Sequence, residues 1–348
     1  MPTIVQFTAP RRVELVEAPA VELPAGHVRV RTWYSGISAG TELTAYRGTN
    51  PYLTKTWDAE RRLFLPGDPS FEYPVQGWGY SEVGEVSEVA DDVTEVAPGQ
   101  VVAGIWGHRS EGVFDVDAPH WRVLPEGADP LHGVFARLGA IALNAVLAAD
   151  ARLGEQVAVF GQGVIGLLAT QLARRSGAQV LAVDALDPRL ALAERYGAAV
   201  VRADVPGGAG ATVRELTGGT GADSAVELSG SYRALHEAVR SVVVDGKVVA
   251  SGFYQGQGEG LWLGEEFHHN RVQILASQIG GAPVALGPRW NQRRLVRTFL
   301  DAVAAGDVVV DDLVSHVMDA GQVSEAFRLL DEAPSEALQV VLRFPAAP

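Results

Sequence analysis

The chain has 348 residues, 47% hydrophobic and 20% charged, which is enough for two ordinary domains with sizeable cores. A net charge of −14 argues against a nucleic acid or an anionic membrane as partner, and the absence of cysteine excludes disulfides, thiolate nucleophiles and cysteine-ligated zinc. No run of about 18 uncharged apolar residues occurs and the N-terminus lacks a basic segment followed by an apolar one, so we expect a cytoplasmic protein with a small-molecule substrate.

The first 125 residues or so have the pattern of a small β domain. Val28–Trp33 alternates polar and apolar residues, Gly84–Ala90 reads as a second strand, and a Pro-Gly turn precedes a third strand at Val101–Ala103. Short strands at this spacing predict a barrel-like domain. From about Gly133 to Ala149 the chain becomes rich in Ala and Leu, which predicts a helix.

Segment 155–177 predicts a strand, a glycine turn and a helix. Val157–Phe160 suits a buried parallel strand, and from residue 165 the apolar residues follow one face of a helix. Three glycines between them are spaced Gly-x-Gly-x-x-Gly. The first permits a tight turn, the second lets the backbone approach a pyrophosphate, and the third lets the helix pack close to the strand. The predicted cofactor contacts of this turn are Gly161, Gly163, Val164, Ile165 and Gly166.

The next apolar run, Val180–Asp184, ends in a carboxylate 18 positions after Gly166. That spacing predicts a hydrogen bond to the ribose 2′-hydroxyl of a dinucleotide. A carboxylate at this place repels the additional phosphate of NADP, so NAD is the expected cofactor. Two alternatives stay open: Asp184 is an exposed residue at a strand end, or Arg189 partly accommodates the phosphate.

A second α/β stretch follows, with a strand in 221–230, a helix over Tyr232–Val244 and a strand over Gly246–Gly252. Ligands of such sheets lie beyond the carboxyl ends of the strands, so residues after both strands should border the nicotinamide. These residues are Glu227, Leu228, Ser229, Gly230, Gly252, Phe253 and Tyr254. The remaining predicted elements are a strand over 271–277, helices over 291–304 and 323–332, and a strand over 337–344.

This order of parts and two motifs resemble the medium-chain dehydrogenase/reductase superfamily, of the zinc alcohol, sorbitol and threonine dehydrogenase type. Segment 36–48 (GISAGTELTAYRG) is similar to the family's Gly-Ile-Cys-Gly-Thr-Asp segment, and segment 79–86 (GYSEVGEV) to its Gly-His-Glu-x-x-Gly-x-Val segment. The resemblance implies an α/β fold with a doubly wound Rossmann sheet over 127–281. It also implies a GroES-like, β-barrel-type catalytic domain over 1–126 with a C-terminal return over 282–348, in a homodimer or homotetramer.

In the family both motifs carry ligands of a catalytic zinc, and this chain lacks those ligands. Ser38 or Ala39 stands in place of the Cys, Tyr80-Ser81 in place of His-Glu, and the third ligand position falls at about Arg137. We therefore expect no metal. The changed motifs look closest to a bacteriochlorophyllide-dehydrogenase-like branch and to dehydrogenases of bacterial secondary metabolism, which have no single substrate.

Without a metal, hydrogen-bond donors and a proton relay must stabilise the alkoxide that precedes hydride transfer. Tyr80 is the leading candidate to donate a hydrogen bond to the reacting oxygen; alternatively, it only fills the space of the metal. Ser38 would be a second partner of that oxygen, or it caps the helix expected near Thr41. Glu42 replaces the family's Asp, either beside the reacting groups or as a carboxylate at a helix N-terminus.

Two further residues are candidates for the catalytic site. Arg137 would hold an anionic or hydroxyl-rich substrate, unless it is a surface arginine. His269 follows His268 just before a Rossmann strand, where it would be either a proton relay or an edge residue that packs.

Segment 50–73 lengthens the interval between Ser38 and Tyr80 to 42 residues, beyond the family's usual length. It contains Tyr52, Trp57, Arg61, Arg62, Phe64 and Phe71. These aromatic side chains would form a lid or wall over a ring-shaped, partly apolar substrate, or they pack on their own domain or on a second subunit.

Three functions follow from these observations. The first is an NAD-dependent, zinc-independent oxidoreductase that interconverts a secondary alcohol and a ketone, on a sugar, cyclitol or other ring of specialised metabolism. The second is a reductase of activated C=C bonds, related to quinone and enoyl reductases, which usually prefer NADPH. The third is a non-catalytic protein that senses NAD.

Overall fold

The computed structural model describes residues 1–348, and the chain divides into two compact units. The first comprises 1–137 and 313–348, and the second comprises 138–312. These borders lie 11 residues (137 − 126) and 31 residues (312 − 281) later than the domain borders expected from the sequence.

The segment between the expected and the observed second border belongs to the Rossmann unit because of its contacts. The Phe299 ring lies so close to Gly139 that a Cβ there would be 2.2 Å from a ring carbon. Arg175 forms an ion pair with Asp307. Composition carries no signal of such long-range contacts, so the second border predicted from the sequence was too early.

The second unit contains a six-stranded parallel sheet with the order β13-β12-β11-β14-β15-β16. Its strands are β11 (Gln156–Phe160), β12 (Gln179–Asp184), β13 (Ala199–Arg202), β14 (Ala222–Glu227), β15 (Val242–Ala250) and β16 (Gln273–Ala276). The strand order reverses between β11 and β14. A ligand crevice is expected outside the carboxyl ends at such a reversal. The doubly wound sheet predicted from the sequence is present.

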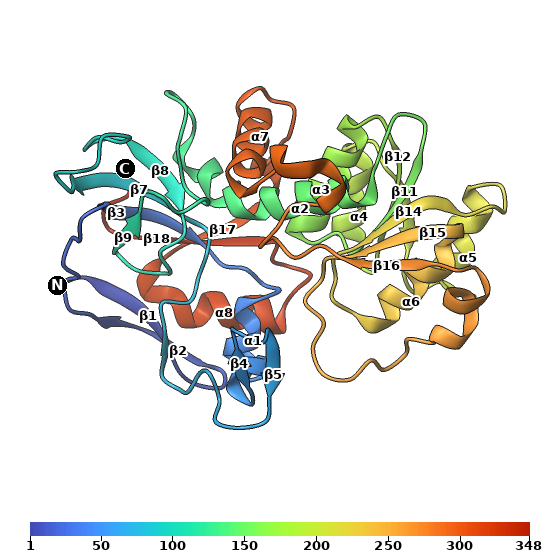
Figure 1. The fold of residues 1–348 in the computed structure, drawn as a ribbon, viewed down its shortest axis with the longest axis horizontal. Coiled ribbons are helices and arrows are strands. Elements are labelled where there is room, and N and C mark those ends of the chain that lie inside the picture. The colour runs from blue at the N-terminus through green and yellow to red at the C-terminus, as the bar shows by residue number, and fades with distance from the viewer. The chain divides into compact units, whose positions relative to one another are not determined.

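Helices cover both faces of this sheet (Figure 1). They are α2 (Ala136–Ala149), α3 (Val164–Arg175), α4 (Asp187–Arg195), α5 (Ala209–Leu216), α6 (Tyr232–Ser241) and α7 (Gln292–Ala304). The helix expected to reach Val244 ends at Ser241, because the β-branched run that begins at Val242 already belongs to β15.

The first unit is built mainly from antiparallel strands. One sheet has the order β2-β1-β6 and a larger one β10-β8-β7-β3-β18-β17, with β9 also paired to β3. Their strands are β1 (Thr3–Ala9), β2 (Arg12–Glu17), β3 (His27–Gly36), β6 (Val75–Gln76), β7 (Glu82–Val89), β8 (Val101–Gly104), β9 (Glu111–Asp115), β10 (Arg122–Val123), β17 (Val314–Asp319) and β18 (Gln339–Arg343). Only β17 and β18 pair in parallel.

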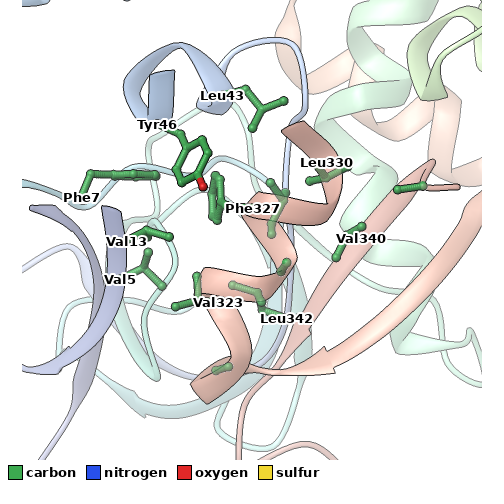
Figure 2. Close-up of a cluster of buried hydrophobic side chains, with 14 of the residues drawn as sticks. Val5, Phe7, Val13, Leu43, Tyr46, Val323, Phe327, Leu330, Val340 and Leu342 are labelled. Atoms are coloured by element: carbon green, nitrogen blue, oxygen red, sulfur yellow. The ribbon is translucent and has the colours of Figure 1, made fainter. Parts of the chain in front are cut away.

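Helices α1 (Glu42–Arg47) and α8 (Val323–Glu332) close the core of this unit. Phe327 of α8 is fully buried and contacts the rings of both Phe7 and Tyr46 (Figure 2). The Phe7 ring meets it edge-on, with centroids 5.1 Å apart. The C-terminal return thus completes the core of the first unit.

The aromatic segment 50–73 forms a short hairpin of β4 (Thr56–Asp58) and β5 (Leu63–Leu65) after a 3-10 turn (Pro51–Leu53). Its rings pack on one another: Phe64 contacts Tyr52 and Trp57, and Phe71 contacts Tyr52 and Trp78, with centroids 4.9 to 5.3 Å apart. Packing within its own unit therefore accounts for most of these side chains. Phe64 nevertheless stays 40% exposed.

Segment Pro130–Ala149 is the one helical segment long and apolar enough to cross a membrane by length and composition. Within the structure, 67% of its most apolar window is buried. Such burial is typical of a core helix.

Candidate active site and dinucleotide-binding turn

The glycine turn between β11 and α3 has the geometry expected of a pyrophosphate cradle. Gly161 has a φ of +88°, which favours glycine. A Cβ on Gly166 would lie 1.8 Å from the Gly161 carbonyl oxygen, so the helix packs directly on the turn. A Cβ on Gly163 would meet no atom within 4 Å. The N–H groups at the start of α3 have no side-chain cap, which leaves them available to an anion.

Asp184 lies beside this turn. Its carboxylate accepts hydrogen bonds from the backbone N–H of Gln162, at 2.6 Å, and of Leu186, at 2.9 Å. Asp184 is only 8% exposed, so the reading as an exposed strand-end residue is wrong. Each oxygen uses one lone pair on the backbone and keeps one for a ribose hydroxyl.

A group of charged residues surrounds the chain just after Asp184. The guanidinium of Arg202 forms ion pairs with Asp187 and Asp204 and also donates to the carbonyl of Ala185. Two carboxylates therefore neutralise this arginine. Arg189, predicted from the sequence as an alternative partner for the additional phosphate of NADP, is half-buried on α4.

The carboxyl ends of β14 and β15 meet the turn. Ser229 lies against Gly161, where an added Cβ would be 2.8 Å from the Ser229 nitrogen. A Cβ on Gly252 would be 2.3 Å from the Gly230 nitrogen, so these two strand ends also touch. Phe253 is 40% exposed at this edge. The structure thus brings together the residues predicted to border the nicotinamide.

Glu227 holds these strand ends in place. It is fully buried and accepts hydrogen bonds from the N–H groups of Ser229 and Gly230 and from the hydroxyls of Ser229 and Tyr254. Burial raises the pKa of Glu227, and these donors partly offset the effect. Its carboxyl faces its own loop, which indicates a structural role.

In the first unit, Tyr80 and Ser38 form a hydroxyl pair. The Tyr80 phenol is hydrogen-bonded to Ser38 Oγ and lies 3.5 Å from Thr41 Oγ1. Thr41, the N-cap of α1, makes no side-chain cap bond, and Ser38 caps with its carbonyl rather than its hydroxyl. Ser38 thus contacts the start of α1 through its backbone, while its hydroxyl pairs with Tyr80. The two segments that resemble the family motifs meet at this pair.

The environment of this pair is electrostatically unusual. Burial and the charge of Glu42 raise the pKa of Tyr80, whereas its two hydroxyl partners and the Arg137 charge lower it. Burial lowers the pKa of Arg137, and the interaction with Tyr80 opposes this shift. Arg137 is half-buried, so it is not simply a surface arginine.

Several buried polar atoms near the pair have no partner within the protein: Glu42 Oε1, Trp78 Nε1 and Ser81 Oγ. Buried polar atoms are normally hydrogen-bonded. A ligand or water would complete the hydrogen bonds of these three atoms.

Sequence reasoning missed His108. This buried residue lies 2.7 Å from Glu42 through Nε2 and 2.6 Å from the Ser35 hydroxyl through Nδ1. Glu42, the first residue of α1, is fully buried. It is therefore half of a buried ion pair rather than a plain helix-terminal carboxylate. His108 lies 66 positions from Glu42, and no local pattern reveals such a pair.

The groups at the family's ligand positions do not fit a catalytic zinc. They are the hydroxyl of Ser38, the phenol of Tyr80 and the guanidinium of Arg137, whereas zinc prefers thiolate, imidazole and carboxylate. The Tyr80 phenol is bonded to neighbouring hydroxyls, and its raised pKa disfavours the phenolate that a metal would require.

The relay role predicted for His269 has no support in the geometry. His268 and His269 precede β16 and are exposed. They therefore lie at the amino ends of the parallel strands, opposite the edge that carries Gly161 and Ser229. Proximity to a strand in sequence did not reveal which edge of the sheet the residue occupies.

A cavity of about 470 Å³ also lies in the second unit, against β16 and the end of α2. Asn144, Ser277 and Val284 are among its lining residues. None of the residues predicted to form the site lines it.

Comparisons with known proteins indicate the family of this chain. The family model "Zinc-binding dehydrogenase" matches residues 164–292. D-guloside 3-dehydrogenase of Shigella flexneri is 30% identical over 345 residues, covering 97% of this chain and 98% of the relative, and the Escherichia coli enzyme of that name matches equally well. (R,R)-butanediol dehydrogenase of Bacillus subtilis is 27% identical over 300 residues, covering 78% of this chain and 80% of the relative.

Solved structures share the fold. A protein described as a short chain alcohol dehydrogenase of Escherichia coli, in complex with NADH, superposes with a TM-score of 0.78 at 19% identity. A protein described as a zinc-binding dehydrogenase of Sinorhizobium meliloti, bound to NADP, also has a TM-score of 0.78, at 22% identity. Each match covers 99% of both chains. The predicted fold class is confirmed.

The chain therefore belongs to the medium-chain dehydrogenase/reductase superfamily, in its zinc-type alcohol dehydrogenase-like part. Within it, the protein is an oxidoreductase of the alcohol and sugar dehydrogenase type.

Proposed function

We propose that the protein is an NAD-dependent, zinc-independent dehydrogenase that oxidises a secondary hydroxyl on a sugar ring or related cyclic substrate to a ketone. The observation that carries the proposal is the buried Tyr80–Ser38 hydroxyl pair at the meeting point of the two motif segments. The substrate class is supported by the relative named D-guloside 3-dehydrogenase, which matches 97% of the chain.

The charges near the glycine turn support NAD rather than NADP. Asp184 is held beside the turn with a free lone pair on each oxygen. Asp187 and Asp204 add negative charge and occupy Arg202, which would otherwise attract a phosphate. Because structures with this fold have been solved with NADH and with NADP, the fold does not distinguish the two cofactors. The proposal of NAD therefore rests on these residues.

The residues of the first unit would handle the proton of the reaction. When bound at the glycine turn, the dinucleotide would supply the hydride acceptor for the carbinol carbon. The substrate hydroxyl would donate to the Tyr80–Ser38 pair. As the carbonyl forms, each hydroxyl would accept one proton and pass its own along the chain to Thr41, from which a proton would leave to solvent water. The positive charge of Arg137, which couples to Tyr80, would stabilise negative charge on the reacting oxygen.

The first experiment tests cofactor and metal without a known substrate. The metal content of the purified protein is measured first, and protein then treated with a chelator is titrated calorimetrically with NAD⁺, NADH, NADP⁺ and NADPH. We expect tight NAD(H) binding without stoichiometric zinc. Preference for NADPH would favour a C=C reductase, and a zinc-dependent activity would contradict the proposal.

The second experiment tests the hydroxyl pair with methyl D-gulosides as substrates. Tyr80→Phe should lower kcat about a hundredfold, because the reacting oxygen loses its hydrogen-bond partner. Tyr73→Phe is the matched control, since the Tyr73 phenol donates to the Ala45 carbonyl in the same unit. Equal turnover in both variants would eliminate Tyr80 as the proton-handling group, and nucleotide binding without turnover of any cyclic alcohol would favour an NAD sensor.

A further inference from the structure

A buried chain of hydrogen bonds links the two segments that carry Tyr80 and Ser38. His108 Nε2 lies 2.7 Å from Glu42 Oε2, and Nδ1 lies 2.6 Å from Ser35 Oγ. The Ser35 hydroxyl donates to Glu82 Oε1 at 3.1 Å, and Glu82 Oε2 accepts from the Trp106 N–H at 2.8 Å. His108, Glu42, Ser35 and Glu82 are all fully buried.

With both carboxylates ionised, these bonds require a charged imidazole. The Ser35 hydroxyl then donates its one hydrogen to Glu82, and His108 Nδ1 donates to the Ser35 oxygen. His108 Nε2 faces a carboxylate and also donates. An imidazole that donates from both nitrogens is positively charged.

The surrounding groups stabilise this charge. Burial alone would lower the pKa of His108, but the charge and hydrogen bond of Glu42 and the charge of Glu82 raise it above its usual value. Burial raises the pKa of Glu82 despite the nearby imidazole. From α8, the only ring in contact is the neutral Phe327, with centroids 6.3 Å apart.

His108 also supports the backbone that carries Tyr80. The backbone N–H of His108 donates to the backbone carbonyl of Trp78 at 3.1 Å. Gly79 has a φ of +125°, and a Cβ there would lie 3.0 Å from His108 Cε1 and 2.9 Å from Glu82 Oε1. The backbone just before Tyr80 therefore lies directly on the imidazole and on the carboxyl of Glu82.

On its other side, His108 holds the segment that carries Ser38. Glu42 follows Thr41 at the start of α1, and its N–H donates to the Ser38 carbonyl at 2.9 Å. His108 is thus the cross-link between segments 38–42 and 78–82, each of which contributes one hydroxyl to the pair.

We propose that the charged His108 is a positioning residue of the dehydrogenase reaction, which orients Tyr80 against Ser38 and neutralises Glu42 beside the phenol. This inference rests on the role proposed for Tyr80. His108 contacts neither the phenol nor the substrate and acts only through the two segments that it joins.

The test uses full-length protein with 3-fluorotyrosine, and the Tyr80 fluorine resonance is identified by its loss in Tyr80→Phe. In His108→Gln, the phenol pKa should rise by about one unit, because Glu42 loses its compensating cation. In Glu42→Gln, the phenol pKa should fall, because the negative charge that raises it is removed. If His108 had only a structural role, the phenol pKa of Tyr80 would shift in the same direction in both variants, or in neither.

His316→Gln is the matched control, since His316 is half-buried in the same unit and its Nδ1 is hydrogen-bonded to the Ser315 hydroxyl. With methyl D-gulosides, His108→Gln should lower kcat about tenfold with little change in KM, while His316→Gln keeps the parent's activity. An unchanged Tyr80 titration in both His108→Gln and Glu42→Gln would overturn the inference. Because the titration needs no substrate, a parent protein inactive on gulosides would contradict the proposed function alone.

Discussion

Replacing Gly163 by alanine should weaken cofactor binding at the glycine turn without lowering the stability of the fold. No atom lies within 4 Å of the new Cβ, and the backbone angles of φ −69° and ψ −172° suit alanine. The unfolded chain loses freedom, so the free energy of unfolding should stay constant or rise by about 0.4–1 kcal/mol. The methyl group would project where a pyrophosphate approaches the N–H groups of α3, so affinity for NADH should fall.

Gly166→Ala is the comparison variant. Its Cβ would lie 1.8 Å from the Gly161 oxygen, 1.6 Å short of the 3.4 Å at which ordinary contact begins. Helix α3 would have to move away from the turn, which should cost about 1–3 kcal/mol of stability. This variant should therefore lose stability and NADH affinity together.

Urea denaturation and calorimetric titration with NADH measure the two effects separately. For Gly163→Ala we expect a dissociation constant at least about tenfold higher, equivalent to about 1.4 kcal/mol, with an unchanged or higher denaturation midpoint. If Gly163→Ala bound NADH as tightly as the parent, the turn would not be the pyrophosphate site. Reduced stability in that variant would contradict the open space at Gly163.

Three further predictions concern other parts of the chain. Asp184→Ala should relax the preference for NAD over NADP, and an unchanged ratio of the two dissociation constants would refute the assignment of Asp184. The folded-state pKa of His108 is raised, so its contribution to stability is complete below the unfolded value of about 6.5 and is lost as pH rises through the folded value. The melting temperature should therefore fall from about pH 6.5 upward, and less steeply in His108→Gln. Phe327→Ala should lower the free energy of unfolding by about 3–5 kcal/mol in urea denaturation, because it removes a fully buried ring from the core.

Local patterns predicted the strand-turn-helix-strand unit that carries the candidate cofactor residues. The three glycines and Asp184 belong to one strand-turn-helix-strand unit, so their spacing in the chain largely determines their spacing in space. Helix α8 has the predicted bounds, Val323–Glu332, because its apolar residues follow the helical period.

The catalytic half was only partly predictable. Tyr80 and Ser38 were chosen from motifs 42 residues apart, and the structure joins them in a hydrogen bond. His269 was misplaced because proximity to a strand does not indicate which edge of a sheet a residue occupies. The domain borders shifted because long-range ion pairs and packing leave no mark in composition.

Sequence by itself determined the fold class, the dinucleotide turn and the absence of the family's zinc ligands, since each depends on residue type and short-range spacing. Only the tertiary structure revealed the chain of His108, Glu42 and Glu82 behind the hydroxyl pair. Its members come from β7, α1 and the segment after β8, and the pairing of β7 with β3 and β8 brings these elements together. A buried charge needs partners, and the fold decides which distant residues provide them.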